Sequence, residues 1–147
     1  MPAIHANIAS GGPLLIATIG VSMPRMQAIL AANQQAPQPI TGTFLIDTGA
    51  SGTCIDETFI AQLGLQPTGT VPIKTPSTGA GLHHCDQFDV SMFIPGENPG
   101  QGHLIPAVPI IATHLKSQGI DGLIGRDILD GCTFIYNGTA KYFTLAY

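Results

Sequence analysis

The chain has 147 residues, a length that suits one domain, 1–147, with a buried core. Its formal net charge is −4 and it has only five lysine and arginine residues without a basic cluster, which argues against nucleic-acid binding. Only 10% of the residues are charged, so we expect a self-interface to cover part of the apolar surface. The 18 glycines and 12 prolines favour turns and short strands over a helix bundle.

The three cysteines are odd in number and far apart, so they do not resemble a disulfide framework and favour a reducing, cytoplasmic location. Residues 1–12 have no clear period, and we expect them to be disordered. Residues 13–23 are mostly apolar, but no lysine or arginine precedes them and they are too short to span a bilayer. We therefore predict neither a signal peptide nor a membrane segment.

The first strand is predicted at 14–22, where Leu, Ile and Val recur. Residues 24–39 are rich in Gln, Asn, Ala and Pro, and we interpret them as a surface loop insertion in which 26–32 could add two helical turns. A short apolar strand follows at 43–46. Residues 56–64 predict a short helix, because Asp56 can cap its start and glycine suits the position after its end.

The remaining segments predict strands and turns, with one short helix near the C-terminus. These are a hairpin of 71–74 and 82–94 with small residues at its tip, a proline-broken strand near a sheet edge at 104–111, a strand at 120–124, a short helix at 125–129, and a final hairpin around Asn137-Gly138. We expect an all-β fold with one or two short helices.

The chemistry is concentrated where the apolar run Phe44-Leu45-Ile46 ends at Asp47-Thr48-Gly49. A carboxylate directly after a buried strand is costly unless hydrogen bonds hold it. Glycine permits a tight turn that brings backbone N–H groups toward the carboxylate, and the threonine hydroxyl can bond to another loop. An ordinary strand-to-loop turn has the same residue types, so this segment alone leaves both interpretations open.

A second segment favours a catalytic interpretation. Two apolar residues, Leu123 and Ile124, precede Gly125 and the start of a helix at Arg126. Together, Leu45-Ile46-Asp47-Thr48-Gly49-Ala50-Ser51 and Leu123-Ile124-Gly125-Arg126-Asp127-Ile128-Leu129 resemble the retropepsin family of aspartic proteases. The likeness covers the chain from about Leu14 onward by order of elements, but only these two segments are specific. It implies a single-domain closed barrel with a flap hairpin and a short C-terminal helix.

The resemblance also implies roles for individual residues. Asp47 corresponds to the catalytic aspartate, Thr48 to a residue whose hydroxyl bonds to a partner subunit's loop, and Gly49 to a backbone contact with substrate. The expected substrate-binding residues are Ala50 and Ser51 beside the loop and the flap-tip residues Ser77, Thr78, Gly79 and Ala80. Leu123, Ile124, Gly125 and Arg126 are expected to support the loop from behind.

Two departures from the family pattern stand out. Retroviral members often carry an aspartate where Ser51 stands, and it pairs with the helix arginine, so the role of Arg126 is open. A hydroxyl at position 50 would stabilise an ionised catalytic carboxylate, which Ala50 cannot do. We therefore expect an activity optimum that is acidic but milder than in relatives with a hydroxyl there.

Peptide hydrolysis of this type needs two adjacent carboxylates, one acting as base and one as acid. The chain offers one Asp-Thr-Gly, so a two-fold homodimer must supply the second Asp47. The sequence thus predicts an endopeptidase that cleaves extended apolar peptide segments and needs no cofactor and no metal.

Two alternatives remain. The first is a non-catalytic peptide-binding or dimerisation module on the same fold, since fold alone does not prove activity. The second is a metal protein that uses His83, His84, Cys85, His103 and His114. Their spacing matches no zinc template, and neighbouring side chains on a strand point to opposite faces.

Overall fold

The computed structural model describes residues 1–74, 79 and 81–147. Its strands are β1 (Ala3–Asn7), β2 (Leu14–Val21), β3 (Ile40–Ile46), β4 (Cys54–Asp56), β5 (Gly69–Ile73), β6 (His83–Pro95), β7 (Gly102–Thr113), β8 (Gly122–Ile124), β9 (Thr133–Asn137) and β10 (Tyr142–Ala146). Its helices are α1 (Met23–Ala31), α2 (Glu57–Leu63), the 3-10 turn η2 (Lys116–Gln118) and α3 (Arg126–Leu129).

Side-chain alternation along the long strands produces one core. In β6, Phe88, Val90, Met92 and Ile94 are buried and the residues between them are not, as expected for a strand with one face inward. Strand β2 shows the same alternation from Leu15 to Ile19. The buried side chains of both strands, α2 and β10 belong to a single hydrophobic cluster.

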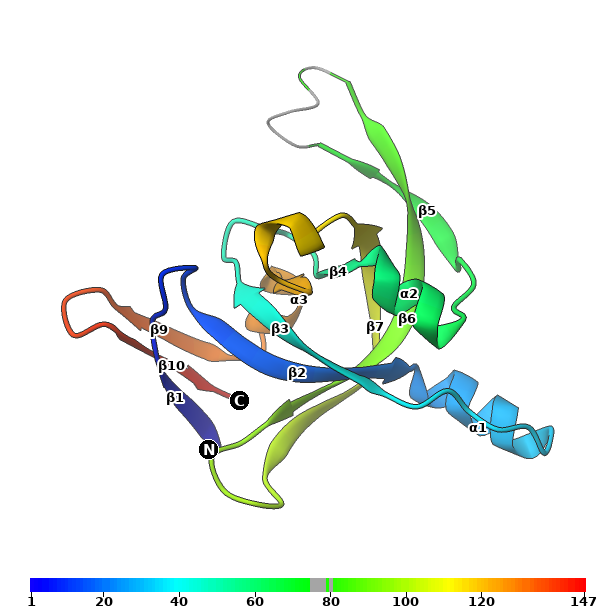
Figure 1. Cartoon of the computed structure of the whole chain (residues 1–147), viewed down its shortest axis with the longest axis horizontal. Coiled ribbons are helices and arrows are strands. Elements are labelled where there is room, and N and C mark those ends of the chain that lie inside the picture. The colour runs from blue at the N-terminus through cyan, green and yellow to red at the C-terminus, as the bar shows by residue number, and fades with distance from the viewer. Residues whose placement is uncertain (75–78, 80) are drawn as a thin grey trace.

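Six strands close into a ring in the order β2, β3, β8, β4, β7, β6 and back to β2, and β5 pairs with the outer part of β6. Strand β8 runs parallel to β3, β4 runs parallel to β7, and the other neighbours in the ring are antiparallel. The predicted closed β-barrel is thus confirmed. Figure 1 shows the β5–β6 hairpin projecting beyond the barrel.

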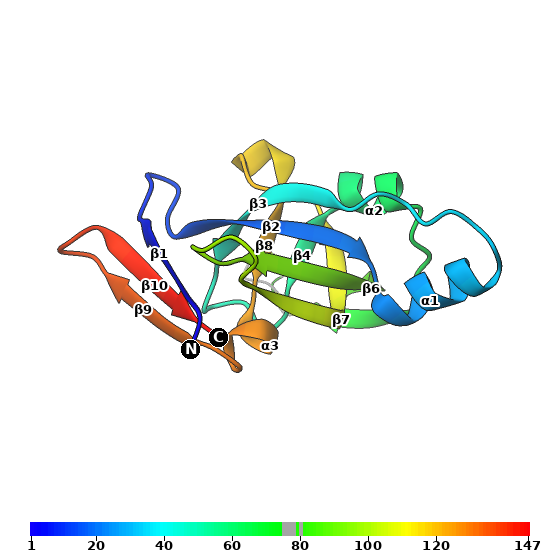
Figure 2. The ribbon, with the colours of Figure 1, turned by 90° about the horizontal axis from the view of Figure 1, so that it is seen from below.

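The residues 1–12, predicted to be disordered, instead contain β1. This strand pairs with β10, which pairs with β9 on its other side, in a separate three-stranded antiparallel sheet. Figure 2 shows this sheet at one end of the molecule and α1 at the other. In β1, Ile4 and Ala6 alternate with His5 and Asn7, and the two apolar side chains pack against the core when β1 pairs with β10.

The segment 24–39, predicted to be a surface loop, contains most of the helix α1. The described residues therefore form three α-helices, where one or two were expected. Pro24 lies in the first turn of α1, where its missing N–H costs nothing, so the helix extends over it. None of its residues is fully buried, and Met26 and Ile29 are only partly covered by the core.

Strand β7 is longer than predicted, and it lies between β6 and β4 rather than at a sheet edge. Residues 102–105 and 108–110 pair with β6 only. Ile111 pairs with both β6 and β4, and residues 112 and 113 pair with β4 only. Pro106 stands where the register shifts, and Pro109 lies in the part paired with β6 only. The prolines thus occupy positions that leave no ladder hydrogen bond unmade.

The Asn137-Gly138 hairpin is present as β9–β10, and residues 138–141 form its connection. Lys141 has a φ of 58°, and the Asn137 Oδ1 accepts a hydrogen bond of 2.9 Å from the Ala140 amide.

No helix among the described residues is long and apolar enough to cross a membrane.

The predicted cap of α2 is confirmed, and it does more than begin a helix. Asp56 is 1% exposed and accepts hydrogen bonds from the hydroxyl and amide of Thr58 and from the amides of Leu115 and Lys116. Burial alone raises the pKa of Asp56, but these hydrogen bonds outweigh it and hold the pKa well below its usual range. One carboxylate therefore joins α2 to the segment after β7.

We expect Asp56→Ala to lower the free energy of unfolding by about 2–4 kcal/mol, because four donors lose their acceptor. The folded-state pKa is lowered, so this stabilisation is present above the unfolded pKa of about 4 and is lost as the pH falls further. Urea unfolding of both proteins at about pH 7, 4.5 and 3 measures the difference. A difference that stays constant across this range would contradict the assignment.

Candidate active site

Asp47 follows β3 directly, at the point where this strand lies between β2 and β8. The Asp47 amide donates to the Ile124 carbonyl over 3.0 Å, which continues the parallel β3–β8 ladder by one more bond. Ile124 is fully buried and Leu123 is partly buried. Leu123 and Ile124 thus lie in β8, the strand that pairs with β3 and bonds to the Asp47 amide.

The turn that follows Asp47 places a backbone amide against the Asp47 carboxylate. The Gly49 amide donates to Asp47 Oδ1 over 2.8 Å, and the Ala50 amide donates to the Asp47 carbonyl over 3.2 Å. A Cβ atom at Gly49 would lie 3.1 Å from Oδ1, so a larger residue would crowd the carboxylate. Within the described residues, Asp47 Oδ2 accepts no hydrogen bond.

The loop presents its polar groups to the surface. Asp47 and Ala50 are half-buried, whereas Thr48, Gly49 and Ser51 are exposed. A carboxylate with one oxygen fixed and the other unbonded can hold a water molecule or face a second carboxylate.

Arg126, which lacks an aspartate partner at position 51, bonds to the backbone of the Asp47 loop instead. Its Nη1 donates to the Thr48 carbonyl over 2.8 Å, and its amide donates to the Ala50 carbonyl over 2.9 Å. The arginine thus holds the backbone of the loop on both sides of Gly49 instead of pairing with a carboxylate at position 51.

Thr53 and Asp127 form a second clamp, which the sequence interpretation missed. The Thr53 hydroxyl and amide donate to the Asp127 carboxylate over 2.8 and 2.9 Å, and the Gly125 amide donates to the Thr53 hydroxyl over 3.2 Å. Thr53 is fully buried. A polar residue directly before the apolar start of β4 was the available signal, because a buried hydroxyl needs a partner.

Gly125 lets these two segments cross. A Cβ atom there would lie 2.5 Å from the Gly52 backbone, closer than side chains in proteins approach. Its backbone is extended, so the glycine is required for space and not for its conformational freedom.

The flap-tip residues Ser77, Thr78 and Ala80 lie outside the described residues. Gly79 is described, with a φ of 60°. The strands that carry the tip, β5 and β6, pair from Gly69 with Gln87 to Ile73 with His83. The predicted hairpin is therefore present up to its tip.

Cys54 lies close to the loop but is not a nucleophile. Burial raises the pKa of its thiol to about 11, with further contributions from Asp127, Cys85 and Asp47. The thiol therefore stays protonated and unreactive near neutral pH.

The histidines make separate contacts. His114 Nδ1 lies 2.9 Å from Glu57 Oε1, and the His103 ring stacks on Tyr147 with centroids 4.8 Å apart. Among the described residues, no three His, Cys, Asp or Glu side chains gather in a group that could hold a metal ion.

Comparison with known proteins decides the family. A family model described as aspartyl protease matches residues 33–128, which contain both the Asp47 loop and the Gly125 segment. The chain belongs to the aspartyl protease family. A comparison with curated protein sequences finds no match.

The chain is also similar in structure to a crystal structure of a retropepsin-like aspartic protease from Rickettsia conorii. The two share 17% sequence identity with a TM-score of 0.56 over 99% of this chain and 90% of that one. At this identity the likeness establishes the fold, which is retropepsin-like.

The Thr53–Asp127 clamp can be tested by a double-mutant cycle with Thr53→Val and Asp127→Ala. We expect a coupling free energy of about 1–2 kcal/mol in urea unfolding, because a charge-assisted hydrogen bond joins the two side chains. The cycle of Thr53→Val with Asp130→Ala is the matched control, since Asp130 is exposed and should show no coupling. Equal coupling in both cycles would contradict the clamp.

Proposed function

We propose that this chain is an aspartic endopeptidase that works as a homodimer, with Asp47 of each copy in one shared active site. The observation that carries the proposal is the Asp47 turn, in which one carboxylate oxygen is fixed by the Gly49 amide while the loop remains at the surface. Membership in the aspartyl protease family supports the same conclusion.

Two carboxylates in contact cannot both ionise readily, so one proton is shared and the pair titrates in two macroscopic steps. The ionised Asp47 accepts a proton from a bound water, which attacks the peptide carbonyl carbon. The protonated Asp47 of the second copy donates its proton to the carbonyl oxygen. The first Asp47, which now carries the water proton, then protonates the peptide nitrogen as the C–N bond breaks, and the second carboxylate takes back a proton from the diol. Because the chain has a single Asp-Thr-Gly, the second carboxylate has to come from another copy.

The neighbours of Asp47 fit this arrangement. Thr48 is exposed and can bond to the loop of the second copy through its hydroxyl. The Gly49 amide is directed at Asp47, so its carbonyl oxygen is the group left for a peptide strand. Ala50 and Ser51 would flank that strand.

The substrate is proposed to be an extended, apolar peptide segment that adds a strand between the flap hairpin and the floor of the shared groove. Leu82, which precedes β6 just after the hairpin tip, is 62% exposed and offers an apolar contact there. Ser77, Thr78, Gly79 and Ala80 are proposed to close over the peptide and exclude water, a role that rests on the sequence resemblance.

We expect Asp47→Asn to lower the cleavage rate of a mixed peptide library at least about a thousandfold, because it removes the acid–base pair. Asparagine keeps an oxygen that can accept from the Gly49 amide, so folding should be unchanged by circular dichroism. A pepstatin-type inhibitor should abolish the wild-type activity. Equal behaviour of wild type and Asp47→Asn would leave a non-catalytic binding module.

Mixing the two proteins tests the dimer directly. If each active site needs two intact copies, the activity of refolded mixtures falls with the square of the wild-type fraction. A linear fall would mean that one chain is sufficient. Asp130→Asn is the matched control, since it changes an exposed carboxylate and should leave activity unchanged in every mixture.

The Ala50 position predicts the pH range. We expect an acidic optimum for the wild type and a shift to lower pH in Ala50→Ser, because the new hydroxyl stabilises the ionised carboxylate. Ala50→Gly is the control without a hydroxyl. A wild-type maximum below about pH 3, or the same profile for all three proteins, would contradict this explanation.

A further inference from the structure

A cavity of about 630 Å³ lies between α2 and the part of β6 that pairs with β5, and Asp47 is not among the residues that line it. Its volume is within the range of small-molecule sites, about 300–1,000 Å³. The proposed protease chemistry uses none of the residues that line this cavity.

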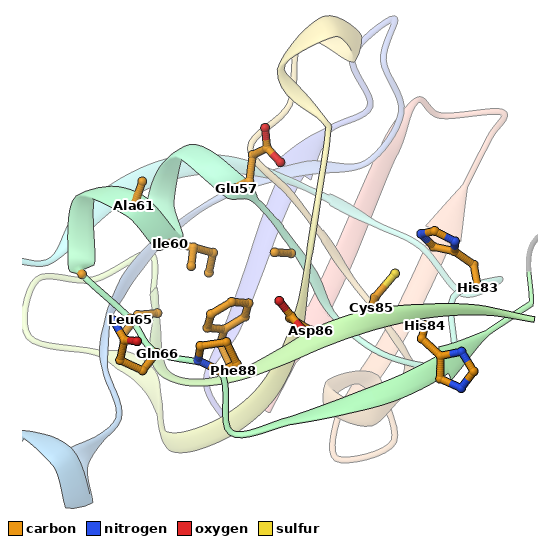
Figure 3. Close-up of a pocket in the computed structure, with 13 residues that line it drawn as sticks. Glu57, Ile60, Ala61, Leu65, Gln66, His83, His84, Cys85, Asp86 and Phe88 are labelled. Carbon is orange, nitrogen blue, oxygen red and sulfur yellow. The ribbon is translucent and has the colours of Figure 1, made fainter.

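One wall of the cavity is apolar, whereas polar side chains make up much of the remaining lining. Ile60 contributes from α2, Leu65 from the segment after it, and Phe88 from β6, and Figure 3 shows these three side chains gathered on one side of the space. All three are at most 8% exposed, so they form a fixed wall that belongs to the core. Such a wall can accept an aliphatic chain.

The charged groups of the cavity are carboxylates. Asp86 comes from β6 beside Phe88 and points toward α2, and Glu57 stands at the first turn of α2 (Figure 3). Glu57 contacts His114, and within the described residues no lysine or arginine forms an ion pair with either carboxylate. The remaining titratable groups of the lining are His83, His84 and Cys85, none of which is a permanent cation.

We propose that this cavity binds an alkylammonium group on an aliphatic stem, with the ammonium beside Asp86 and the stem along Ile60, Leu65 and Phe88. The charge complementarity is local, since an acidic group borders an apolar wall, and it agrees with the net charge of −4 of the chain. Two sources share this chemistry: a free small amine, and the side chain of a lysine in a polypeptide. The inference does not rest on the proposed protease function.

The probe is pentylamine, titrated at about pH 8 into the isotopically labelled full-length chain and followed by amide chemical shifts, at a pH where histidine side chains carry little charge. We expect saturable shifts confined to residues 57–67 and 83–88, with a dissociation constant on the order of 1–10 mM for so small a ligand. Pentanol, which has the same stem without the charge, should bind more weakly.

Three variants locate the site. Asp86→Asn should weaken pentylamine binding about two- to fivefold, which is the range for an exposed ion pair. Ala61→Phe, which fills the space from α2, should abolish the shifts. Asp130→Asn, which changes an exposed carboxylate outside the lining, should bind like wild type. Thermal unfolding of each variant checks that it is folded.

Equal affinity of Asp86→Asn and wild type, equal binding of pentanol and pentylamine, or shifts centred elsewhere would each overturn the proposal. Nα-acetyl-lysine methylamide distinguishes the two sources. Binding of this probe at the same residues identifies a lysine side chain as a fitting occupant, and binding of pentylamine alone identifies a free amine. A failed protease assay would leave all of these outcomes unchanged, so the two proposals fail separately.

Discussion

The rest of the site depends on how the Asp47 carboxylate is held. It stands at the end of β3, between the neighbouring strands β2 and β8. The hydrogen bond from the Asp47 amide to the Ile124 carbonyl ties the backbone of Asp47 to β8. The Gly49 amide then fixes one carboxylate oxygen. Because the strand is part of a closed barrel, any displacement of Asp47 would disturb the core as well.

The loop after Asp47 is held twice by the start of α3. Arg126 bonds to the backbone beside Gly49, and Asp127 bonds to Thr53 at the far end of the loop. Two consecutive residues of one short helix thus fix both ends of the turn, and Gly125 permits the approach that makes this possible. An arginine that binds a carbonyl thus supports the loop without a carboxylate at position 51.

The strands and the Asp-Thr-Gly turn could be predicted from the sequence because both depend on local patterns, whereas the closed barrel was expected only from the resemblance to the retropepsin family. Alternation along β2 and β6 specifies which face is inward, and the cap of α2 follows from Asp56 and Gly64 alone. The Asp-Thr-Gly turn likewise requires only neighbours in the chain. What stayed hidden depends on partners far away in sequence: β1 forms because β10 is present, and Thr53 is a clamp only because Asp127 lies beside it.

The same distinction separates the two proposed sites. Around Asp47, a single chain fixes one carboxylate, and in the proposed mechanism the second carboxylate comes from a copy of the same loop, because like carboxylates share one proton only when they meet. Around Asp86 the cavity is formed by one chain, since α2 and β6 provide both the wall and the charge. Dilution should therefore separate the two proposed activities: dissociation into single chains removes the shared acid–base pair and leaves the amine site intact.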